Sequence, residues 1–566
     1  MNTTNFESSN FNEDSKTDAP CLIECGQGVS VLYKDRYLYS KYAPSKAINN
    51  LIENLTISDN SIVLIFSPAL WLGIEKLIEK LPQTSKIVAI EFDNNLYNFS
   101  TKNLPQKYKN EISFFNESTK NDFLLELQKG HYKKVIPIEF SAGTIFNKEK
   151  YNNFFSITQS IVDQNLKNKL TLIKFGRLYS KNIFKNLRLI PNSIPFKNLF
   201  NKITKPILVL GAGESLNQTI EKIKGKEKSF FILSVDAALN SILANNIQPD
   251  AIVAVESQIA IEKAYIGKSI NSKIPIFCDL VGRPHIPEII NGPISFFISK
   301  YASMKFLDTL SSKNILPPTI KPLGSVGLVA MDIALKLRRN DSIKIFFSGL
   351  DFSYSVGISH AKNTMAHNNQ LISTTKLKSI YNIDTAFSQG TSFVNSKDNS
   401  KMITTIALKN YSLLFTDSFK DEKNIFDIGL EGIDLGFKKV FLSEQFFLEA
   451  EENQNGRNNF SELLFSNKPE QKNKVLLKEI IYEFLSKELN QLFVLKDILS
   501  NGEKSSYRDN NISLLEQIQN IIQEREYLFI HFPDAYGKTN IQSFLNRIKI
   551  EADFFIKEIS IAKKSL

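Results

Sequence analysis

One glycine-containing loop in the sequence has the composition of a phosphate-binding turn. Residues 207–210 are apolar, and Gly211-Ala212-Gly213-Glu214-Ser215 leads directly from them into a helical pattern. In such a loop, glycines let the backbone approach a phosphate, and the first N–H groups of the helix donate to it. Residue 216 is Leu where a dinucleotide-binding motif has its third glycine, so NAD is not the natural ligand. The sequence therefore predicts either a phosphate site at Gly211, Gly213 and Ser215 or a tight turn that binds nothing.

Carboxylates follow the next two expected strands. Asp236 comes directly after the apolar run at 230–235, and Glu256 comes directly after the run at 251–255. The carboxyl ends of parallel strands form the ligand-binding edge of an α/β sheet, so Asp236 could accept hydrogen bonds from a ribose hydroxyl or a base amine. Asp236 could instead cap the helix that follows it, and Glu256 could be a solvated loop residue. Both alternatives stay open here.

Two later segments bring small and polar residues to the same expected edge. Gly324-Ser325 precedes a helical pattern, which suits a phosphate, although Ser325 could equally be an ordinary N-cap. Gly349-Leu350-Asp351 ends another apolar strand and leads into a polar loop that holds Tyr354 and His360. Histidine suits proton transfer near neutral pH, and only His360, of five histidines, follows a strand that ends at this edge. His360 is therefore either a general base or a surface loop residue.

The elements that position these residues form a repeating pattern of short apolar runs and helical segments. This alternation predicts an α/β fold with two Rossmann-like parallel-sheet domains, followed by an α-helical C-terminal domain. The expected divisions are a disordered tail at 1–20, an N-terminal domain at 21–200, a central catalytic domain at 201–450 and a helical domain at 451–566. The expected strands lie at 62–66, 87–90, 135–138, 170–173, 207–210, 230–235, 251–255, 275–278, 294–298 and 343–347.

Composition narrows the class of protein. The 566 residues contain 69 Lys and Arg against 59 Asp and Glu, a net charge of +10, which permits an anionic ligand without requiring nucleic acid. Three cysteines are too few for a disulfide framework and fit a reducing cytoplasm. We expect no signal peptide, because the first residues have no apolar core, and no transmembrane span, because no long apolar stretch occurs. The sequence has no Asp-x-Asp, no P-loop motif and no metal-ligand spacing of His or Cys, so we expect no metal site.

Taken together and in order, these segments resemble the motility-associated factor (Maf) family of flagellin glycosyltransferases. The resemblance rests on segments 211–216, 236–239, 247–250 and 349–352, and it continues at 360–361 and 404–411. The central region is also similar to the family 42 bacterial sialyltransferases. That similarity covers Gly211 to Leu216, Gly324 to Gly327, Gly349 to Phe352 and His360-Ala361-Lys362-Asn363-Thr364.

The resemblance implies transfer of a nonulosonic, sialic-acid-like sugar from a CMP-activated donor to Ser or Thr of flagellin, in support of flagellum assembly and motility. It implies that His360 deprotonates the acceptor hydroxyl and that Tyr354 lies near the leaving phosphate. It requires no cofactor, with stimulation by Mg²⁺ as an option. The residues expected to bind the nucleotide sugar are Gly211, Gly213, Ser215, Asp236, Glu256, Gly324, Ser325, Gly349 and Asp351.

Two departures from the families bear on the ligands. Glu214 stands where the sialyltransferases have proline, and its carboxylate could favour the helix N-terminus or repel an anionic donor. Ser67-Pro68-Ala69-Leu70-Trp71 replaces the glycine-rich loop of the N-terminal domain, so we do not expect S-adenosylmethionine to bind there. That domain is expected to be structural or to recognise the acceptor.

Two other functions remain as alternatives. One is a diphosphotransferase similar to the archaeal-type pterin pyrophosphokinases, which resemble the central domain but are much shorter chains. The other is a flagellin-binding protein without catalytic activity, which would hold flagellin through the amphipathic helices after residue 470.

Overall fold

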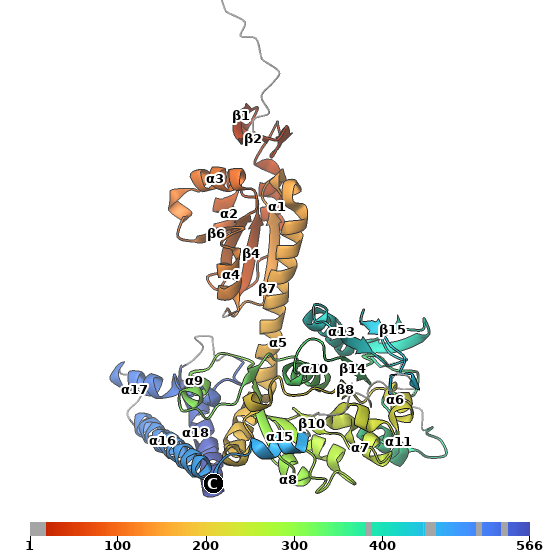
Figure 1. Ribbon diagram of the computed structural model, residues 1–566. Helices are drawn as coiled ribbons and strands as arrows, with labels where there is room; N and C mark the ends of the chain where they lie inside the picture. Colours follow the sequence, from red (N-terminus) through yellow and green to blue (C-terminus); the bar gives the residue numbers. More distant parts are fainter. Residues whose placement is uncertain are drawn as a thin grey trace, which may run out of the picture. The chain divides into compact units, whose positions relative to one another are not determined.

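The computed structural model describes residues 19–128, 130–379, 388–444, 446–447, 460–504, 512–533 and 541–566. The chain forms two compact units, one ending at Thr171 and one running from Leu172 to Leu566 (Figure 1). The predicted tail at 1–20 falls almost entirely outside the described residues. No helix in the described ranges is both long and apolar enough to span a bilayer.

The first unit is built on a parallel sheet with strand order β6-β5-β4-β7. Its central strand, β4, is buried along its whole length, which explains why residues 62–66 are an unbroken apolar run. The strands predicted at 62–66, 87–90 and 135–138 are confirmed. The sheet strands are β4 (Ser61–Phe66), β5 (Lys86–Glu91), β6 (Ile112–Asn116) and β7 (Lys134–Glu139). An antiparallel sheet precedes them: β1 (Cys21–Cys25), β2 (Gly28–Tyr33) and β3 (Arg36–Tyr37).

Helices connect these strands, and the last of them continues into the second unit. They are α1 (Lys46–Asn54), α2 (Ile74–Glu79), α3 (Asn94–Asn103), α4 (Lys120–Leu127) and α5 (Lys148–Asn186). The strand predicted at 170–173 is wrong, because these residues lie within α5. A run of four apolar residues does not distinguish a strand from a helix by its period. In the helix, Leu172 is buried whereas Leu170 is exposed.

The second unit contains a sheet of order β13-β12-β11-β10-β9-β8-β14-β17-β18, with every pairing parallel. All six strands predicted here are confirmed, and the sheet extends beyond them at both edges. The strands are β8 (Ile207–Leu210), β9 (Phe231–Val235), β10 (Ala251–Ala254), β11 (Ile276–Asp279), β12 (Ile294–Ser299), β13 (Thr319–Ile320), β14 (Ile345–Ser348), β17 (Ile425–Asp427) and β18 (Lys438–Lys439). An antiparallel hairpin, β15 (Thr391–Asn395) and β16 (Lys401–Thr405), lies outside this sheet.

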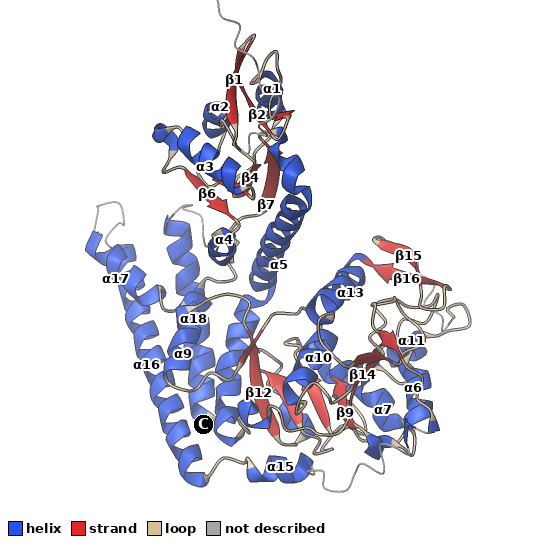
Figure 2. Ribbon diagram, turned by 45° about the horizontal axis from the view of Figure 1, so that its top comes forward, coloured by secondary structure: helices blue, strands red, loops and turns tan. Residues whose placement is uncertain are grey.

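Helices cover the sheet and continue to the C-terminus (Figure 2). Those that connect the strands are α6 (Leu216–Ile223), α7 (Leu239–Ala244), α8 (Ile286–Ile290), α9 (Lys305–Ser312), α10 (Val326–Leu337), α11 (Met365–Ser373) and α13 (Ile406–Phe419). The C-terminal helices are α15 (Phe460–Ser466), α16 (Gln471–Lys504), α17 (Ile512–Ile522) and α18 (Ile541–Lys564). The predicted fold class is confirmed.

The C-terminal helices share one hydrophobic core with the central sheet. Phe184 of α5, Phe296 of β12, Leu492 of α16 and Phe555 of α18 all belong to it. The two compact units accordingly divide within α5, whereas the sequence interpretation placed divisions near residues 200 and 450. The last turns of α5 belong to the second unit because their apolar side chains are buried in this core.

Candidate functional site

The predicted site residues gather at the point where the strand order of the second sheet reverses. From β8 the chain adds β9 to β13 in succession on one side, and then returns to add β14 on the other side of β8. In doubly wound sheets, ligands bind beyond the carboxyl ends of the strands at such a reversal. Gly211 follows β8 and Gly349 follows β14, so both loops lie at this edge.

The glycines at this edge permit two loops to touch. A Cβ at Gly211 would lie 2.3 Å from the carbonyl oxygen of Gly349, and a Cβ at Gly349 would lie 2.2 Å from the carbonyl oxygen of Gly211. Leu350 fills the space beside them, since a Cβ at Gly327 would lie 2.5 Å from its Cδ2 atom. The structure therefore brings together the three predicted glycine segments around Leu350.

The N–H groups of the glycine loop bind the neighbouring loop. Gly211 donates to the carbonyl oxygen of Ser348 at 2.8 Å, and Gly213 donates to that of Gly349 at 2.9 Å. Ser215 donates through its N–H to Asp351 Oδ2 at 2.9 Å, and its hydroxyl donates to Oδ1. The Asp351 carboxylate thus lies at the N-terminus of α6, where an anion is favoured. That these residues contact a nucleotide sugar stays a prediction.

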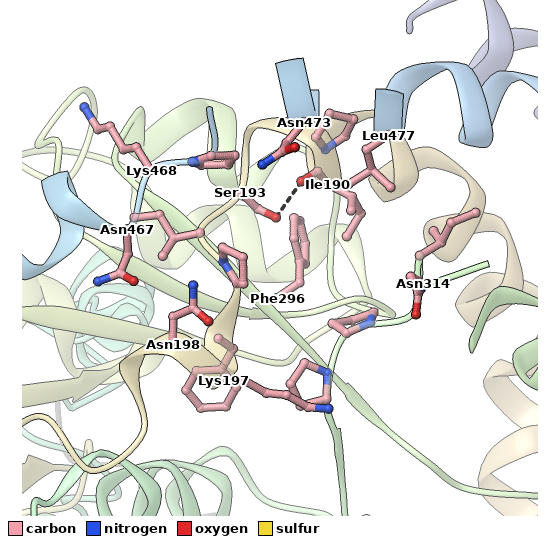
Figure 3. A pocket seen from close by; sticks show the side chains of 18 of the residues that line it. Ile190, Ser193, Lys197, Asn198, Phe296, Asn314, Asn467, Lys468, Asn473 and Leu477 are labelled. Carbon is pink, nitrogen blue, oxygen red and sulfur yellow. Dashed lines mark hydrogen bonds between the residues drawn. The ribbon is translucent and has the colours of Figure 1, made fainter. Parts of the chain in front are cut away.

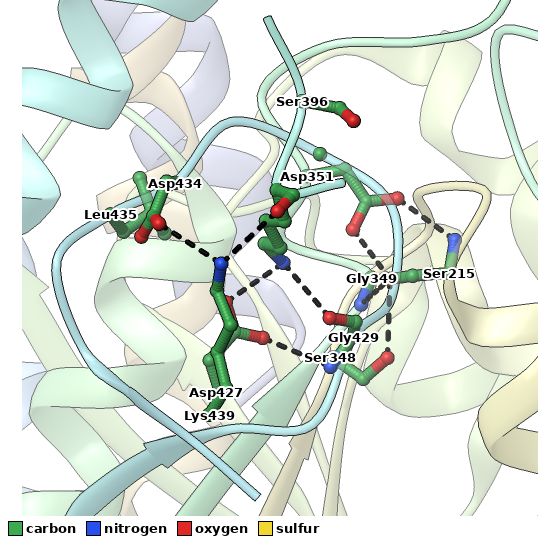
Figure 4. Close-up of polar contacts among 12 residues, drawn as sticks. Ser215, Ser348, Gly349, Asp351, Ser396, Asp427, Gly429, Asp434, Leu435 and Lys439 are labelled. Atoms are coloured by element: carbon green, nitrogen blue, oxygen red, sulfur yellow. Dashed lines mark hydrogen bonds and ion pairs between the residues drawn. The ribbon is translucent and has the colours of Figure 1, made fainter. Parts of the chain in front are cut away.

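Asp351 belongs to a buried polar network (Figure 4). Burial raises its pKa to about 6, while the nearby Lys397 ammonium acts in the opposite direction. Lys397 forms a 2.8 Å ion pair with Asp427 at the end of β17, and both side chains are almost fully buried. Asp427 also accepts from the N–H of Gly429 at 2.9 Å. The sequence analysis missed Lys397 and Asp427, because β17 is only three residues long and gives little apolar signal.

The two predicted strand-end carboxylates differ in their surroundings. Asp236 is buried, and its Oδ1 accepts from the N–H of Ala237 at 2.7 Å. Burial, together with the charge of Glu256, raises the pKa of Asp236 to about 7. Glu256 is partly exposed, and its Oε1 accepts from the N–H groups of Ser257 and Gln258. Asp236 therefore has the perturbed protonation typical of functional sites, whereas Glu256 braces its own loop.

The loop with Tyr354 and His360 packs on the glycine loop. Ala361 donates its N–H to the carbonyl oxygen of Ala212 at 3.0 Å, which places His360 next to that loop. The His360 side chain is exposed, and its Nδ1 lies 3.0 Å from Ser359 Oγ. Desolvation by surrounding protein atoms lowers the pKa of His360, so the ring stays neutral at pH 7 and can accept a proton. Tyr354 is buried, and its backbone pairs with Ile403 of β16.

The Gly324-Ser325 segment lies at the same edge, because Gly327 in the first turn of α10 packs against Leu350. Ser325 is the N-cap of α10, with no hydrogen bond from its side chain to the helix. Gly324 has a φ of +70°, and a Cβ there would lie 3.1 Å from Cε1 of Tyr411 on α13. Two more tyrosines, Tyr179 and Tyr301, lie near by, and sequence reasoning missed both. Tyr301 could have been found, because it follows a predicted strand by three residues.

Glu214 also faces this loop cluster. Its Oε2 accepts from the N–H of Ser355 at 3.3 Å, so the carboxylate helps to hold the loop that carries Tyr354. Glu431 is close enough for the charge of Glu214 to raise its pKa, although burial is the larger cause. The edge is therefore acidic around the glycine loop. Within the described residues, no group of three or more His, Cys, Asp or Glu side chains is arranged to hold a metal ion.

A cavity of about 580 Å³ lies at the opposite edge of the sheet (Figure 3). Its lining includes Ser193, Lys197, Asn314 and Lys468, and Phe296 of β12. Segments 190–198 and 314–318 precede strands, so this cavity lies at the amino ends. Such a position is not the usual ligand edge of a parallel sheet.

The first unit has its own strand reversal, between β4 and β7, and there the Ser141 hydroxyl after β7 donates to the Ser67 hydroxyl after β4 at 3.2 Å. Ser67 donates to the buried Glu91 carboxylate at 2.7 Å, and Tyr151 donates to the other oxygen. Burial raises the pKa of Glu91. The loop after β4 has positive φ angles at the non-glycine residues Ser67, Ala69 and Trp71, where the sequence analysis noted missing glycines.

The second unit is thus a doubly wound α/β unit whose strand reversal gathers polar loops at one edge. Comparisons with known proteins agree with this class. Residues 181–357 match a family model described as 6-hydroxymethylpterin diphosphokinase MptE-like. An uncharacterized protein of Treponema pallidum (strain Nichols) is 28% identical over 570 residues, which covers 97% of this chain and 96% of that protein.

A solved structure matches over nearly the whole length. The Maf glycosyltransferase from Magnetospirillum magneticum AMB-1 aligns with 96% of this chain and 91% of its own, with a TM-score of 0.54 and 11% sequence identity. At that identity, the likeness concerns the fold. The resemblance to the Maf family that the sequence motifs predicted is confirmed at this level.

Proposed function

We propose that the protein is a glycosyltransferase that uses the carboxyl edge of the second sheet as its active site. The observation that carries the proposal is the fold shared with a Maf glycosyltransferase over 96% of the chain. The position of His360 beside the glycine loop supports it, because a neutral histidine there suits removal of a proton from an acceptor hydroxyl. The match to the pterin diphosphokinase-like model covers residues 181–357, which include strands β8 to β14. It does not by itself indicate a kinase.

We further propose a CMP-activated nonulosonic acid as donor and Ser or Thr of flagellin as acceptor, in support of flagellum assembly and motility. In the reaction, His360 accepts the hydroxyl proton while the acceptor oxygen bonds to the anomeric carbon of the sugar. The bond from that carbon to the phosphate oxygen breaks, and CMP leaves with the bonding electrons. The N-terminus of α10 at Gly324-Ser325 favours the phosphate charge, and we place Tyr354 beside it.

We propose that the step requires no metal, and transfer assays with and without Mg²⁺ test whether the ion stimulates it. The cysteines Cys21, Cys25 and Cys278 are all free thiols. Free thiols fit a reducing compartment, so we propose the cytoplasm as the place where flagellin is modified.

The test combines binding with transfer. The purified full chain is titrated by calorimetry with CMP, ATP and S-adenosylmethionine, and flagellin produced together with the chain is weighed by mass spectrometry. We expect CMP to bind selectively and His360→Ala to reduce sugar addition by roughly 100-fold or more, the usual contribution of a general base. His367→Ala is the matched control, since His367 lies seven residues further on, in α11.

Three results would redirect the proposal. Full transfer by His360→Ala would remove the base role, and selective ATP binding would favour a diphosphotransferase. A flagellin complex insensitive to CMP-sugars and to His360 substitution would favour a binding protein without catalysis.

A further inference from the structure

Three tyrosines from distant parts of the chain meet at the carboxyl edge of the second sheet. They are Tyr179 of α5, Tyr301 after β12 and Tyr411 of α13. The ring centroids of Tyr179 and Tyr301 are 5.4 Å apart, and their planes are inclined by 34°. Tyr411 contacts Gly324, at the N-terminus of α10. All three side chains are partly exposed, so they form a surface at the edge rather than part of the core.

Helix α5 holds its tyrosine in place through two buried asparagines. Asn182 Nδ2 donates to the carbonyl oxygens of Ser257 and Val281, at 3.2 and 2.9 Å. Asn186 Nδ2 donates to those of Leu280 and Gly282, at 2.8 and 3.0 Å. These four carbonyls belong to the loops that follow β10 and β11. The asparagines therefore fix Tyr179, one turn earlier, against the same two loops.

Carboxylates border the tyrosines. Glu256 follows β10, and Asp279 ends β11, the neighbouring strand. The charges of both act on Tyr179, and that of Asp279 acts on Tyr301. Asp279 is occupied by the N–H groups of Val281 and Ser299. Glu256 is the partly exposed carboxylate of the two. Among the described residues, its hydrogen bonds from Ser257 and Gln258 all go to Oε1, so Oε2 is the atom that can face a ligand.

The three phenols are protonated at neutral pH, because the ordinary pKa of tyrosine is about 10 and burial raises it further. Burial is the largest cause that raises the pKa of Tyr179, to about 12, and it also raises the pKa of Tyr301 and Tyr411. Protonated hydroxyls can both donate and accept hydrogen bonds, and an aromatic face packs against the apolar face of a ring. A neighbouring carboxylate accepts hydrogen bonds from hydroxyl groups. This combination suits a ring that bears several hydroxyls.

We propose that Tyr179, Tyr301, Tyr411 and Glu256 form a subsite for a hydroxyl-bearing sugar ring of the substrate. The inference rests on the proposed function and deepens it, because such a ring occurs twice in a nucleotide-sugar donor. One is the ribose, and the other is the transferred sugar. Gly324-Ser325 adjoins the subsite through Tyr411, so a phosphate at the N-terminus of α10 would lie beside the bound ring.

The experiment titrates the full-length chain with two probes, CMP and CMP-N-acetylneuraminate, by calorimetry. Tyr179→Phe, Tyr301→Phe and Tyr411→Phe each remove one hydroxyl and keep the ring, and Glu256→Gln removes the charge. We expect each to weaken binding by roughly three- to tenfold, the effect of one lost hydrogen bond. Tyr482→Phe, at a half-exposed tyrosine of α16, is the matched control and should bind as the wild type does. Thermal unfolding of each variant checks that it is folded.

The two probes separate the two rings. Weaker binding of both probes assigns the subsite to the ribose, and weaker binding of the sugar-bearing probe alone assigns it to the transferred sugar. If every folded variant binds both probes as tightly as the wild type, the subsite is refuted while the glycosyltransferase proposal stands. If the wild type binds neither probe, the CMP donor and the subsite are refuted together.

Discussion

At the scale of single residues, burial changes the protonation of three carboxyl groups at the strand ends of this site. Asp236, Asp279 and Asp351 each end or follow a strand of the second sheet and are buried. Burial raises the pKa of all three, to about 7, 6 and 6. Each accepts at least one backbone N–H, which favours the ionised form and offsets part of the effect of burial. These residues should therefore bind protons in the folded protein that they release when it unfolds.

The raised pKa of Asp236 makes the free energy of unfolding depend on pH. Its pKa is about 7 in the folded protein and 3.8 in an ordinary carboxyl group. The folded state holds the proton between these values, so this stabilisation is complete below pH 4 and is lost as the pH rises through 7. Asp236→Asn cannot ionise. As the pH rises from 4 to 8, we expect the free energy of unfolding of the variant to increase relative to that of the wild type. The increase should be at most about 4 kcal/mol.

Urea unfolding at a series of pH values measures this difference. Asp308→Asn, at an exposed position of α9, is the control. Parallel curves for Asp236→Asn and wild type across the range would contradict the shift.

At the scale of elements, the β15–β16 hairpin is joined to the main sheet by one buried ion pair. Lys397, in the turn of the hairpin, pairs with Asp427 of β17, and its ammonium also donates to the carbonyl oxygen of Gly429 at 3.3 Å. The strand β16 also pairs with Tyr354 through Ile403. The hairpin thus supports the loop that carries Tyr354 toward the site.

Breaking this pair from either side should be costly. Lys397→Met leaves the Asp427 carboxylate buried without its cation, and Asp427→Asn removes the carboxylate that pairs with the buried ammonium. We expect each to lower the free energy of unfolding by about 3–5 kcal/mol, and the double variant to lose clearly less than the sum.

A double-mutant cycle by denaturant unfolding measures the coupling. The exposed pair Lys420–Asp417, 3.7 Å apart, provides the comparison, and Lys420→Met should change stability by less than about 1 kcal/mol. Additive losses for Lys397 and Asp427 would show that the pair is not coupled.

At the scale of the whole molecule, tryptophan fluorescence reports on the unfolding of only one of the two units. The sequence has a single tryptophan, Trp71, and it is buried in the first unit, where its Nε1 donates to the carbonyl oxygen of Ser100 at 2.8 Å. In the second unit, a buried Glu488 accepts from Arg525 and from the Tyr527 hydroxyl, both at 2.8 Å.

Because each unit has its own core, we expect two unfolding transitions. Glu488→Gln should destabilise the second unit by about 3 kcal/mol, since it leaves the buried Arg525 without its anion. Its calorimetric transition should shift while the Trp71 fluorescence transition does not. Ile87→Ala, in the buried core of the first unit, is the reciprocal variant and should shift the fluorescence transition, by about 2–5 kcal/mol. A single transition that both variants move equally would contradict separate unfolding.

The prediction of the fold from sequence succeeded where strands are central and buried. Strands covered on both faces are mostly apolar, so β8 and residues 62–66 of β4 are visible as continuous apolar runs, and β9 as a run interrupted by Ser234. It failed where local patterns carry less information. The run at 170–173 is equally compatible with a helix, and the short strands β13, β17 and β18 have too few residues to show a pattern.

The sequence by itself determined the sheet architecture and the edge at which the polar loops lie, because the carboxyl ends of parallel strands share one edge whatever the details of packing. Only the tertiary structure decided what those loops do for one another. Gly211 is a glycine because Gly349 approaches it, and Asp351 occupies the N-terminus of α6 because β14 lies beside β8. The contacts of Lys397 with Asp427 and of Tyr179 with Tyr301 likewise join distant segments. A local pattern specifies which face of an element is buried, but the partner on that face is chosen by how the whole chain packs.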